Sequence, residues 1–134
     1  MEKQGGGGVK LIIAGSRTLD LTLSFTVGAI RQFGLMTRVD EIVSGGAKGV
    51  DLAGEMTARN LDLGVAKFPA DWGAHGRSAG PIRNRQMAEY ADALLLIWDG
   101  QSRGSLNMKN QMGKLGKPIY EVILRRHNVP EGEA

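Results

Sequence analysis

Hydrophobic positions along the chain follow two spacings, one typical of buried strands and the other of amphipathic helices. Short, almost continuously apolar runs end in polar or glycine-containing loops, and residues at helical spacing follow most of these loops. This pattern predicts strands at residues 9–14, 40–44, 65–68, 93–98 and 118–124. The expected helices cover residues 21–33, 50–63, 81–90 and 106–115.

Strands that alternate with helices along one chain are typical of a parallel sheet with helices on both faces. The sequence therefore predicts an α/β fold with a five-stranded, mainly parallel sheet, in a single domain over residues 9–124. Residues 1–8 end in four consecutive glycines, which predicts a flexible leader. Residues 125–134 are mostly polar and are expected to form a tail.

A glycine-rich turn joins the strand at residues 40–44 to the helix that starts at Val50. Glycine allows positive φ and lets a ligand approach the main chain, and the helix start offers unpaired N–H groups to an anion. A tight connection without a ligand would give the same pattern. Asp51 could accept a hydrogen bond from a ribose hydroxyl, or it could only be an acidic residue favoured in the first helical turn by the helix dipole. The candidate binding residues of this turn are Ser44, Gly45, Gly46, Ala47, Gly49 and Asp51.

Two more polar loops follow the first and fourth expected strands, at the sheet edge where parallel α/β folds bind ligands. After the first strand, Gly15, Ser16 and Arg17 offer a backbone N–H, a hydroxyl and a guanidinium to a phosphate. The loop after the fourth strand opens a helix and is rich in glycine and hydroxyl groups. Its candidate residues are Asp99, Ser102, Gly104 and Ser105.

Residues 69–80 break the periodic pattern with glycines and a proline, and loops of this length in a compact chain are usually functional. Trp72 and His75 could stack on a flat base, although Trp72 could equally anchor a lid on the core. Arg77, Arg83 and Asn84 flank the start of the next helix, where an arginine could clamp a second anion.

Composition narrows the chemistry that these 134 residues can perform. The chain has no cysteine and two histidines, so we expect neither a metal site nor a cofactor. A net charge of +3 permits a phosphate-bearing partner without requiring nucleic acid. The longest apolar run is too short to cross a bilayer, and no signal-peptide pattern is present, which predicts a cytoplasmic protein without membrane contact.

Four motifs, in this order, resemble the SLOG superfamily and, within it, the small YspA-like proteins of bacteria and phages. The motifs are Gly15-Ser16-Arg17, residues 44–51, residues 79–87 and residues 99–105, followed by Gly116-Lys117-Pro118. The resemblance implies a Rossmann-like three-layer fold that binds a nucleotide or an ADP-ribose-like ligand, with phosphates on the two glycine-rich loops. Relatives pair through helices beside the pocket, which implies a homo-oligomer.

Related Lonely Guy phosphoribohydrolases cut the bond between a base and ribose phosphate with an arginine and a glutamate. Arg83 and Met87 match their Arg-Lys-x-x-Met pattern, but Met108 stands where their glutamate is expected. A thioether cannot act as a general acid or base. An N-glycosidic hydrolase with Arg83 as a catalytic residue is therefore an alternative that needs another acid, with Asp51, Asp99 and Glu89 as candidates.

The DNA-processing protein A family shares a loop that resembles residues 44–51 and binds single-stranded DNA, which gives a second alternative. The few aromatic residues and the modest charge argue against a long base-stacking groove. We therefore expect a nucleotide-derived small molecule as the partner, in preference to nucleic acid.

Overall fold

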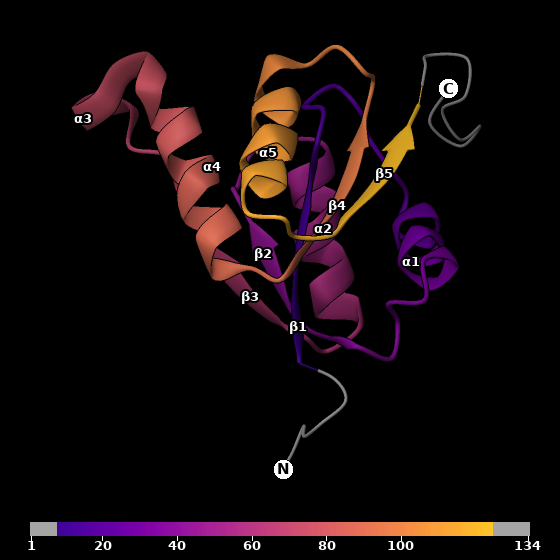
Figure 1. The fold of residues 1–134 in the computed structure, drawn as a ribbon. Helices are drawn as coiled ribbons and strands as arrows, with labels where there is room; N and C mark the ends of the chain where they lie inside the picture. Colours follow the sequence, from indigo (N-terminus) through magenta and orange to yellow (C-terminus); the bar gives the residue numbers. More distant parts are fainter. Residues whose placement is uncertain (1–7, 125–134) are drawn as a thin grey trace.

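The computed structural model describes residues 8–124, which form one sheet between two layers of helices (Figure 1). The expected leader and tail therefore lie outside the described residues, except for Gly8. The strands are β1 (Val9–Gly15), β2 (Val39–Ser44), β3 (Gly64–Lys67), β4 (Ala93–Trp98) and β5 (Ile119–Ile123). The helices are α1 (Leu23–Gln32), α2 (Val50–Asn60), α3 (Trp72–His75), α4 (Ala79–Tyr90) and α5 (Arg103–Lys114), with a short 3-10 turn, η1 (Gly76–Ser78), before α4.

The five strands pair in the order β3-β2-β1-β4-β5, and every pair is parallel. The predicted α/β class and five-stranded sheet are confirmed. The chain runs from β1 outward to β3 and then returns to β4 on the other side of β1, so the strand order reverses between β1 and β4. In open parallel sheets, ligands bind beyond the carboxyl ends of the strands at such a reversal.

The core consists of two apolar layers, one on each face of the sheet. Leu11 and Ile13 of β1 pack with α1 and α2, whereas Ile12 and Ala14 pack with α4 and α5. This division arises because successive strand side chains point to opposite faces. All four side chains and all of β4 are buried, which explains why these strands appear as continuous apolar runs.

Residues 69–80 differ most from the prediction, because a loop was expected and much of the segment is helical. The Asp71 Oδ1 atom accepts the Ala74 N–H at 3.0 Å, which starts α3. Helix α4 begins at Ala79, two residues before Pro81. Proline fits the first turn of a helix because the N–H groups there have no acceptor within the helix. Helix α5 likewise begins at Arg103, three residues earlier than expected, because Ser102 caps it.

Within residues 8–124, no helix is long and apolar enough to cross a membrane.

Candidate functional site

A cavity of about 470 Å³ lies at the carboxyl edge of the sheet, where the strand order reverses. Its lining comes from the loops after β1 and β4, from α2 and its preceding loop, from α3 and η1, and from the first turns of α4 and α5. Four arginines and two aspartates line it, so positive charge dominates. These residues are Arg17, Arg77, Arg83, Arg103, Asp51 and Asp99.

Ser16 links the end of β1 to the end of β4. Its N–H donates to the Ile97 carbonyl at 3.3 Å, and its Oγ accepts the Asp99 N–H at 3.0 Å. A Cβ added at Gly15 would lie 1.7 Å from the Ile97 carbonyl oxygen, so this close approach requires glycine. Gly15, Ser16 and Arg17 all line the cavity, and their role in phosphate binding stays a prediction.

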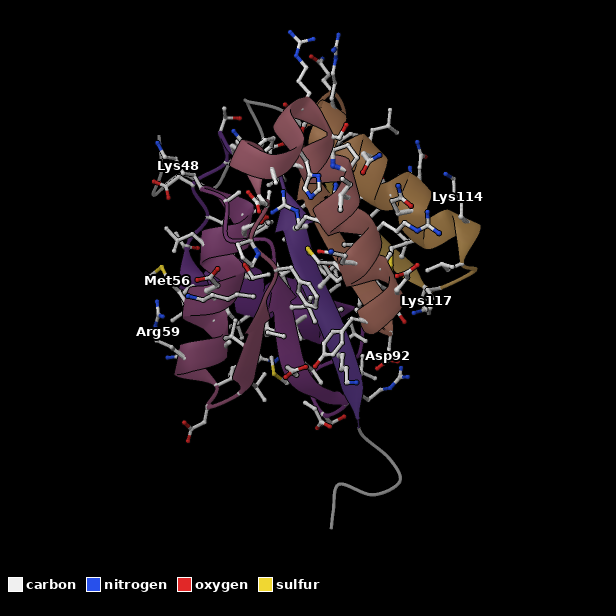
Figure 2. All side chains as sticks on the ribbon, turned by 90° about the vertical axis from the view of Figure 1, so that its left-hand side faces the viewer. Lys48, Met56, Arg59, Asp92, Lys114 and Lys117 are labelled. Carbon is white, nitrogen blue, oxygen red and sulfur yellow. The ribbon has the colours of Figure 1, made fainter. Side chains whose placement is uncertain are left out.

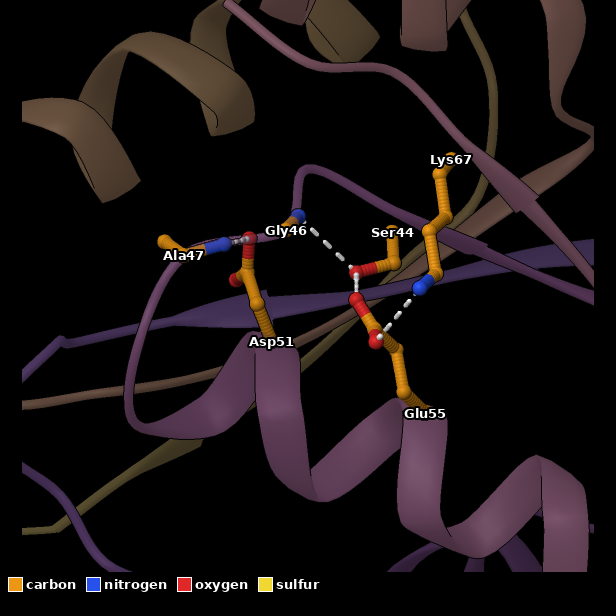
Figure 3. Close-up of polar contacts among 6 residues, drawn as sticks. All are labelled: Ser44, Gly46, Ala47, Asp51, Glu55 and Lys67. Atoms are coloured by element: carbon orange, nitrogen blue, oxygen red, sulfur yellow. Dashed lines mark hydrogen bonds and ion pairs between the residues drawn. The ribbon is translucent and has the colours of Figure 1, made fainter.

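The glycine-rich turn before α2 is bonded mainly to itself. The Ser44 hydroxyl donates to Glu55 Oε2 at 2.6 Å and accepts the Gly46 N–H at 3.0 Å. Both bonds are drawn in Figure 3. The Ala47 N–H donates to Asp51 Oδ2 at 3.2 Å. Several N–H groups of the turn are therefore occupied by protein acceptors.

Of this turn, Ala47 and Asp51 line the cavity, whereas Ser44, Gly45, Gly46 and Gly49 lie outside its lining. Gly49 has φ +73°, and a Cβ there would lie 2.4 Å from the Ser16 carbonyl oxygen. The N–H of the next residue, Val50, also donates to the Ser16 carbonyl oxygen, at 3.3 Å. Gly49 thus packs this turn against the end of β1, which is a role independent of any ligand.

Asp51 is 6% exposed, and burial is the main cause that raises its pKa above the ordinary value. Hydrogen bonding from Ala47 and the positive charge of Arg83 act in the opposite direction. One turn further along α2, the buried carboxylate of Glu55 lies 3.5 Å from the Lys67 ammonium (Figure 3). The sequence analysis missed Glu55, although its four-residue spacing from Asp51 places both on one face of α2.

Arg83 reaches from α4 to the turn before α2. Its Nη1 atom donates to the Gly45 carbonyl at 2.6 Å, and its Nε atom donates to Asn84 Oδ1 at 3.0 Å. Burial is the main cause that lowers the pKa of Arg83, and an arginine remains protonated all the same. Arg83 therefore brings a fixed positive charge to the cavity floor.

The Asn84 side chain is buried and uses both ends of its amide. Its Nδ2 atom donates to the Gly104 carbonyl at 3.3 Å and to Asn107 Oδ1 at 3.0 Å. Because its Oδ1 accepts from Arg83, Asn84 connects that guanidinium to the start of α5. The sequence predicted Asn84 as a ligand-binding residue, and in the structure its amide braces Arg83 against the start of α5.

The start of α5 lines the cavity with Ser102, Arg103, Gly104 and Ser105. Ser102 Oγ accepts the Ser105 N–H, and Asp99 Oδ1 accepts the N–H groups of Gln101 and Ser102 at 2.8 and 2.9 Å. These last bonds are the main causes that lower the pKa of Asp99. Among the described residues, the N–H groups of Arg103 and Gly104 have no acceptor.

Trp72 and Arg77 line the cavity, whereas His75 lies outside its lining. Trp72 is 51% exposed, and its Cη2 atom would touch a Cβ at Gly80 at 3.4 Å. The indole therefore leans on the first turn of α4 with much of its surface open. Arg103 and Asn107 also line the cavity and were not predicted, although four-residue spacing on one helix face relates them.

Two residues of the hydrolase alternative lie away from the cavity lining. Met108 is buried in the apolar layer between α5 and the sheet. Glu89 forms an ion pair with Arg85 near the end of α4 that lies away from the cavity. At this end, the Lys117 ammonium donates to the carbonyls of Ala88, Glu89 and Ala91 (Figure 2). Asp51 and Asp99 are thus the carboxylates that line the cavity within the described chain.

The fold and the site define a Rossmann-like α/β domain with an arginine-lined cavity at the carboxyl edge of its sheet. The structure resembles the X-ray structure of DNA processing protein A (DprA) from Streptococcus pneumoniae, with a TM-score of 0.70 and 20% sequence identity. The match covers 92% of this chain and 54% of that one, so this chain spans about half the length of that protein. This likeness shows the fold.

No protein-family model matches the sequence, and no curated protein matches it. The resemblance to the SLOG superfamily and its YspA-like branch therefore stays a prediction.

Proposed function

We propose that the cavity binds the phosphates of a nucleotide or an ADP-ribose-like ligand. One observation carries this proposal: four arginines from separate segments converge, together with the start of α5, on one cavity at the strand reversal. Its volume of about 470 Å³ falls in the range that small-molecule sites occupy. Helix starts and arginines are the elements that recognise phosphate in proteins.

The contacts of the four arginines suggest that they contribute to phosphate binding in two different ways. Arg17, Arg77 and Arg103 are exposed and have no hydrogen-bond or ion-pair partner within residues 8–124. They are free to bind phosphate oxygens beside the open N–H groups of Arg103 and Gly104. Arg83 is held by Gly45 and Asn84, so it would act mainly through its charge. The open face of Trp72 offers a surface on which a base could stack.

Equilibrium dialysis against a mixture of AMP, NAD, ADP-ribose and cyclic ADP-ribose tests the proposal. We expect the parent protein to concentrate at least one of these compounds, and the double variant Arg17→Ala, Arg103→Ala to bind it at least tenfold more weakly. Arg85→Ala is the matched control, because Arg85 is an exposed arginine of α4 that lies outside the cavity lining. A parent protein that retains none of the four compounds would refute nucleotide binding.

Single-stranded DNA is a second candidate ligand, and the likeness to DNA processing protein A favours it. The exposed arginines of the cavity could contact a DNA backbone as well as a mononucleotide. This candidate predicts that oligonucleotide affinity falls steeply with salt, since bound phosphates release counterions. A flat titration at low salt would exclude it.

The hydrolase alternative and the homo-oligomer remain predictions. Release of free base from a bound nucleotide would support a hydrolase that uses Asp51 or Asp99, and light scattering of the purified protein would determine its oligomeric state.

A further inference from the structure

The Asn84 amide can take only one orientation, because its neighbours fix it from both sides. The Arg83 guanidinium has N–H donors and no acceptor, so Arg83 Nε can bond to Asn84 only at Oδ1. The Gly104 carbonyl accepts and cannot donate, so it must face Asn84 Nδ2, which lies 3.3 Å away. The Nδ2 atom of Asn84 therefore points from α4 towards α5, the helix that packs beside it (Figure 1).

This orientation determines that of Asn107, a residue of α5 that lines the cavity. Asn84 Nδ2 lies 3.0 Å from the Asn107 amide, and a donor at that place requires the oxygen of Asn107, Oδ1, to face it. The Asn107 Nδ2 atom must then face the other way, and its N–H groups have no acceptor within residues 8–124. Asn107 thus carries unused donors whose direction is set by Arg83 through the Asn84 amide.

The surroundings of these donors indicate the kind of acceptor that they would bind. Arg103 precedes Asn107 by about one helical turn, so both side chains lie on one face of α5, and both line the cavity. Arg103 is exposed and also has no partner within the described chain. A phosphate has several charged oxygens and can accept from a guanidinium and an amide together. The carbonyl of a base offers one neutral oxygen, which would leave Arg103 without a counter-charge.

We infer that the Asn107 amide donates a hydrogen bond to a phosphate oxygen beside Arg103. This inference rests on the proposed function and adds to it a binding residue whose polarity the protein fixes in advance. Because the amide can present only donors to the ligand, it favours a phosphate at this place over any group that donates.

Equilibrium dialysis against AMP, NAD, ADP-ribose and cyclic ADP-ribose, with inorganic pyrophosphate as a competitor, tests the inference. Asn107→Leu removes the donors, and we expect both the retained nucleotide and pyrophosphate to bind about tenfold more weakly. Asn107→Asp keeps an oxygen for Asn84 Nδ2 but turns a negative charge towards the phosphate, so binding should fall about a hundredfold. A residue that only braces Asn84 would give the reverse order, because aspartate preserves that contact and leucine does not.

Asn110→Leu and Asn110→Asp are the matched controls, because Asn110 is an exposed asparagine of the same helix outside the cavity lining. Both should bind as the parent does, and thermal unfolding would verify that all variants are folded. The loss caused by Asn107→Asp should also persist in an Arg103→Ala background. There, the new carboxylate has no arginine one turn away with which to form an ion pair.

Asn107→Asp binding as tightly as the parent, or more tightly than Asn107→Leu, would overturn the inference and leave nucleotide binding intact. Weaker nucleotide binding with unchanged pyrophosphate affinity would assign the donors to the base or the ribose and overturn it as well. A parent that retains none of the four nucleotides, or that keeps them in excess pyrophosphate, would refute the proposed function and the inference with it.

Discussion

The turn before α2 and the loop before α5 have the same ingredients and use them differently. Each follows a parallel strand, contains glycine and serine, and has an aspartate that accepts loop N–H groups. In the first, Ser44, Asp51 and Ser16 take up the N–H groups of residues 46, 47 and 50. In the second, Ser102 caps α5 by accepting the Ser105 N–H, whereas Gly49, at the start of α2, provides no side-chain cap. Both helix starts leave N–H groups without an acceptor within the described chain, those of Asp51 and Leu52 in α2 and those of Arg103 and Gly104 in α5.

The two aspartates also differ in their surroundings. Asp51 is buried and its pKa is raised, whereas Asp99 is partly exposed and its pKa is lowered by the N–H groups it binds. The comparison teaches that a glycine-rich turn at a helix start does not by itself identify a phosphate site. Since both helix starts leave N–H groups open, the side chains around them must decide which start could bind an anion.

Gly49→Ala should have the largest effect on stability. The substitution forces alanine into φ +73° and places its Cβ 2.4 Å from the Ser16 carbonyl oxygen, so we expect a loss of about 3 kcal/mol in the free energy of unfolding. Gly104→Ala, at a position with open space, should instead raise stability by about 0.5 kcal/mol. Urea denaturation would measure both, and equal effects would show that the two glycines have the same role.

Asn84→Leu should break the connection between the two loops. Arg83, which holds Gly45, would lose its Asn84 acceptor, and the Gly104 carbonyl would lose its donor. We expect a stability loss of about 2 kcal/mol and AMP binding about tenfold weaker. Asn110→Leu, on the exposed side of α5, is the control and should change neither quantity. A variant as stable as the parent would argue against this bracing role.

Asp99→Asn should cost about 1 kcal/mol at pH 7, because the loop before α5 would lose a charged acceptor for two N–H groups. Since folding lowers the pKa of Asp99, its stabilisation is present above the ordinary value of 3.8 and disappears as the pH falls further. The difference between parent and variant should therefore shrink below that pH. Urea titrations at pH 7 and pH 3 would measure it.

Asp51→Asn should show the opposite pH dependence, with a smaller effect. Folding raises the pKa of Asp51, so its contribution to stability is complete below the ordinary value of 3.8 and is lost as the pH rises through the folded-state pKa. Relative to the parent, the variant should therefore be least stable in acid and should gain up to about 1 kcal/mol by pH 7. A constant difference across this range would mean that burial does not control this carboxyl group.

The strands and the sheet edge that holds the cavity could be predicted because continuous apolar runs end in polar loops, as at Ala14 and Trp98. The partners of individual hydrogen bonds could not be predicted. Nothing in the residues 44–51 reveals that Ser44 bonds to Glu55, or that Asp51 accepts from Ala47, because both bonds depend on how α2 packs against the sheet. The helical turns at residues 72–78 were missed because Gly73 and Gly76 disfavour helix, although Asp71 caps the first turn.

The hydrogen bond from the Asp99 N–H to Ser16 Oγ spans 83 positions of the sequence, and it has a consequence for biosynthesis. Because β2 precedes β4 in the chain, β1 can pair with β2 before β4 is synthesised, while its other edge has no partner until β4 follows. Both the central sheet and the cavity are then completed in the same late step. A nascent chain that stalls before β4 would present an open, largely apolar strand edge, which is the kind of surface that chaperones recognise and that promotes aggregation.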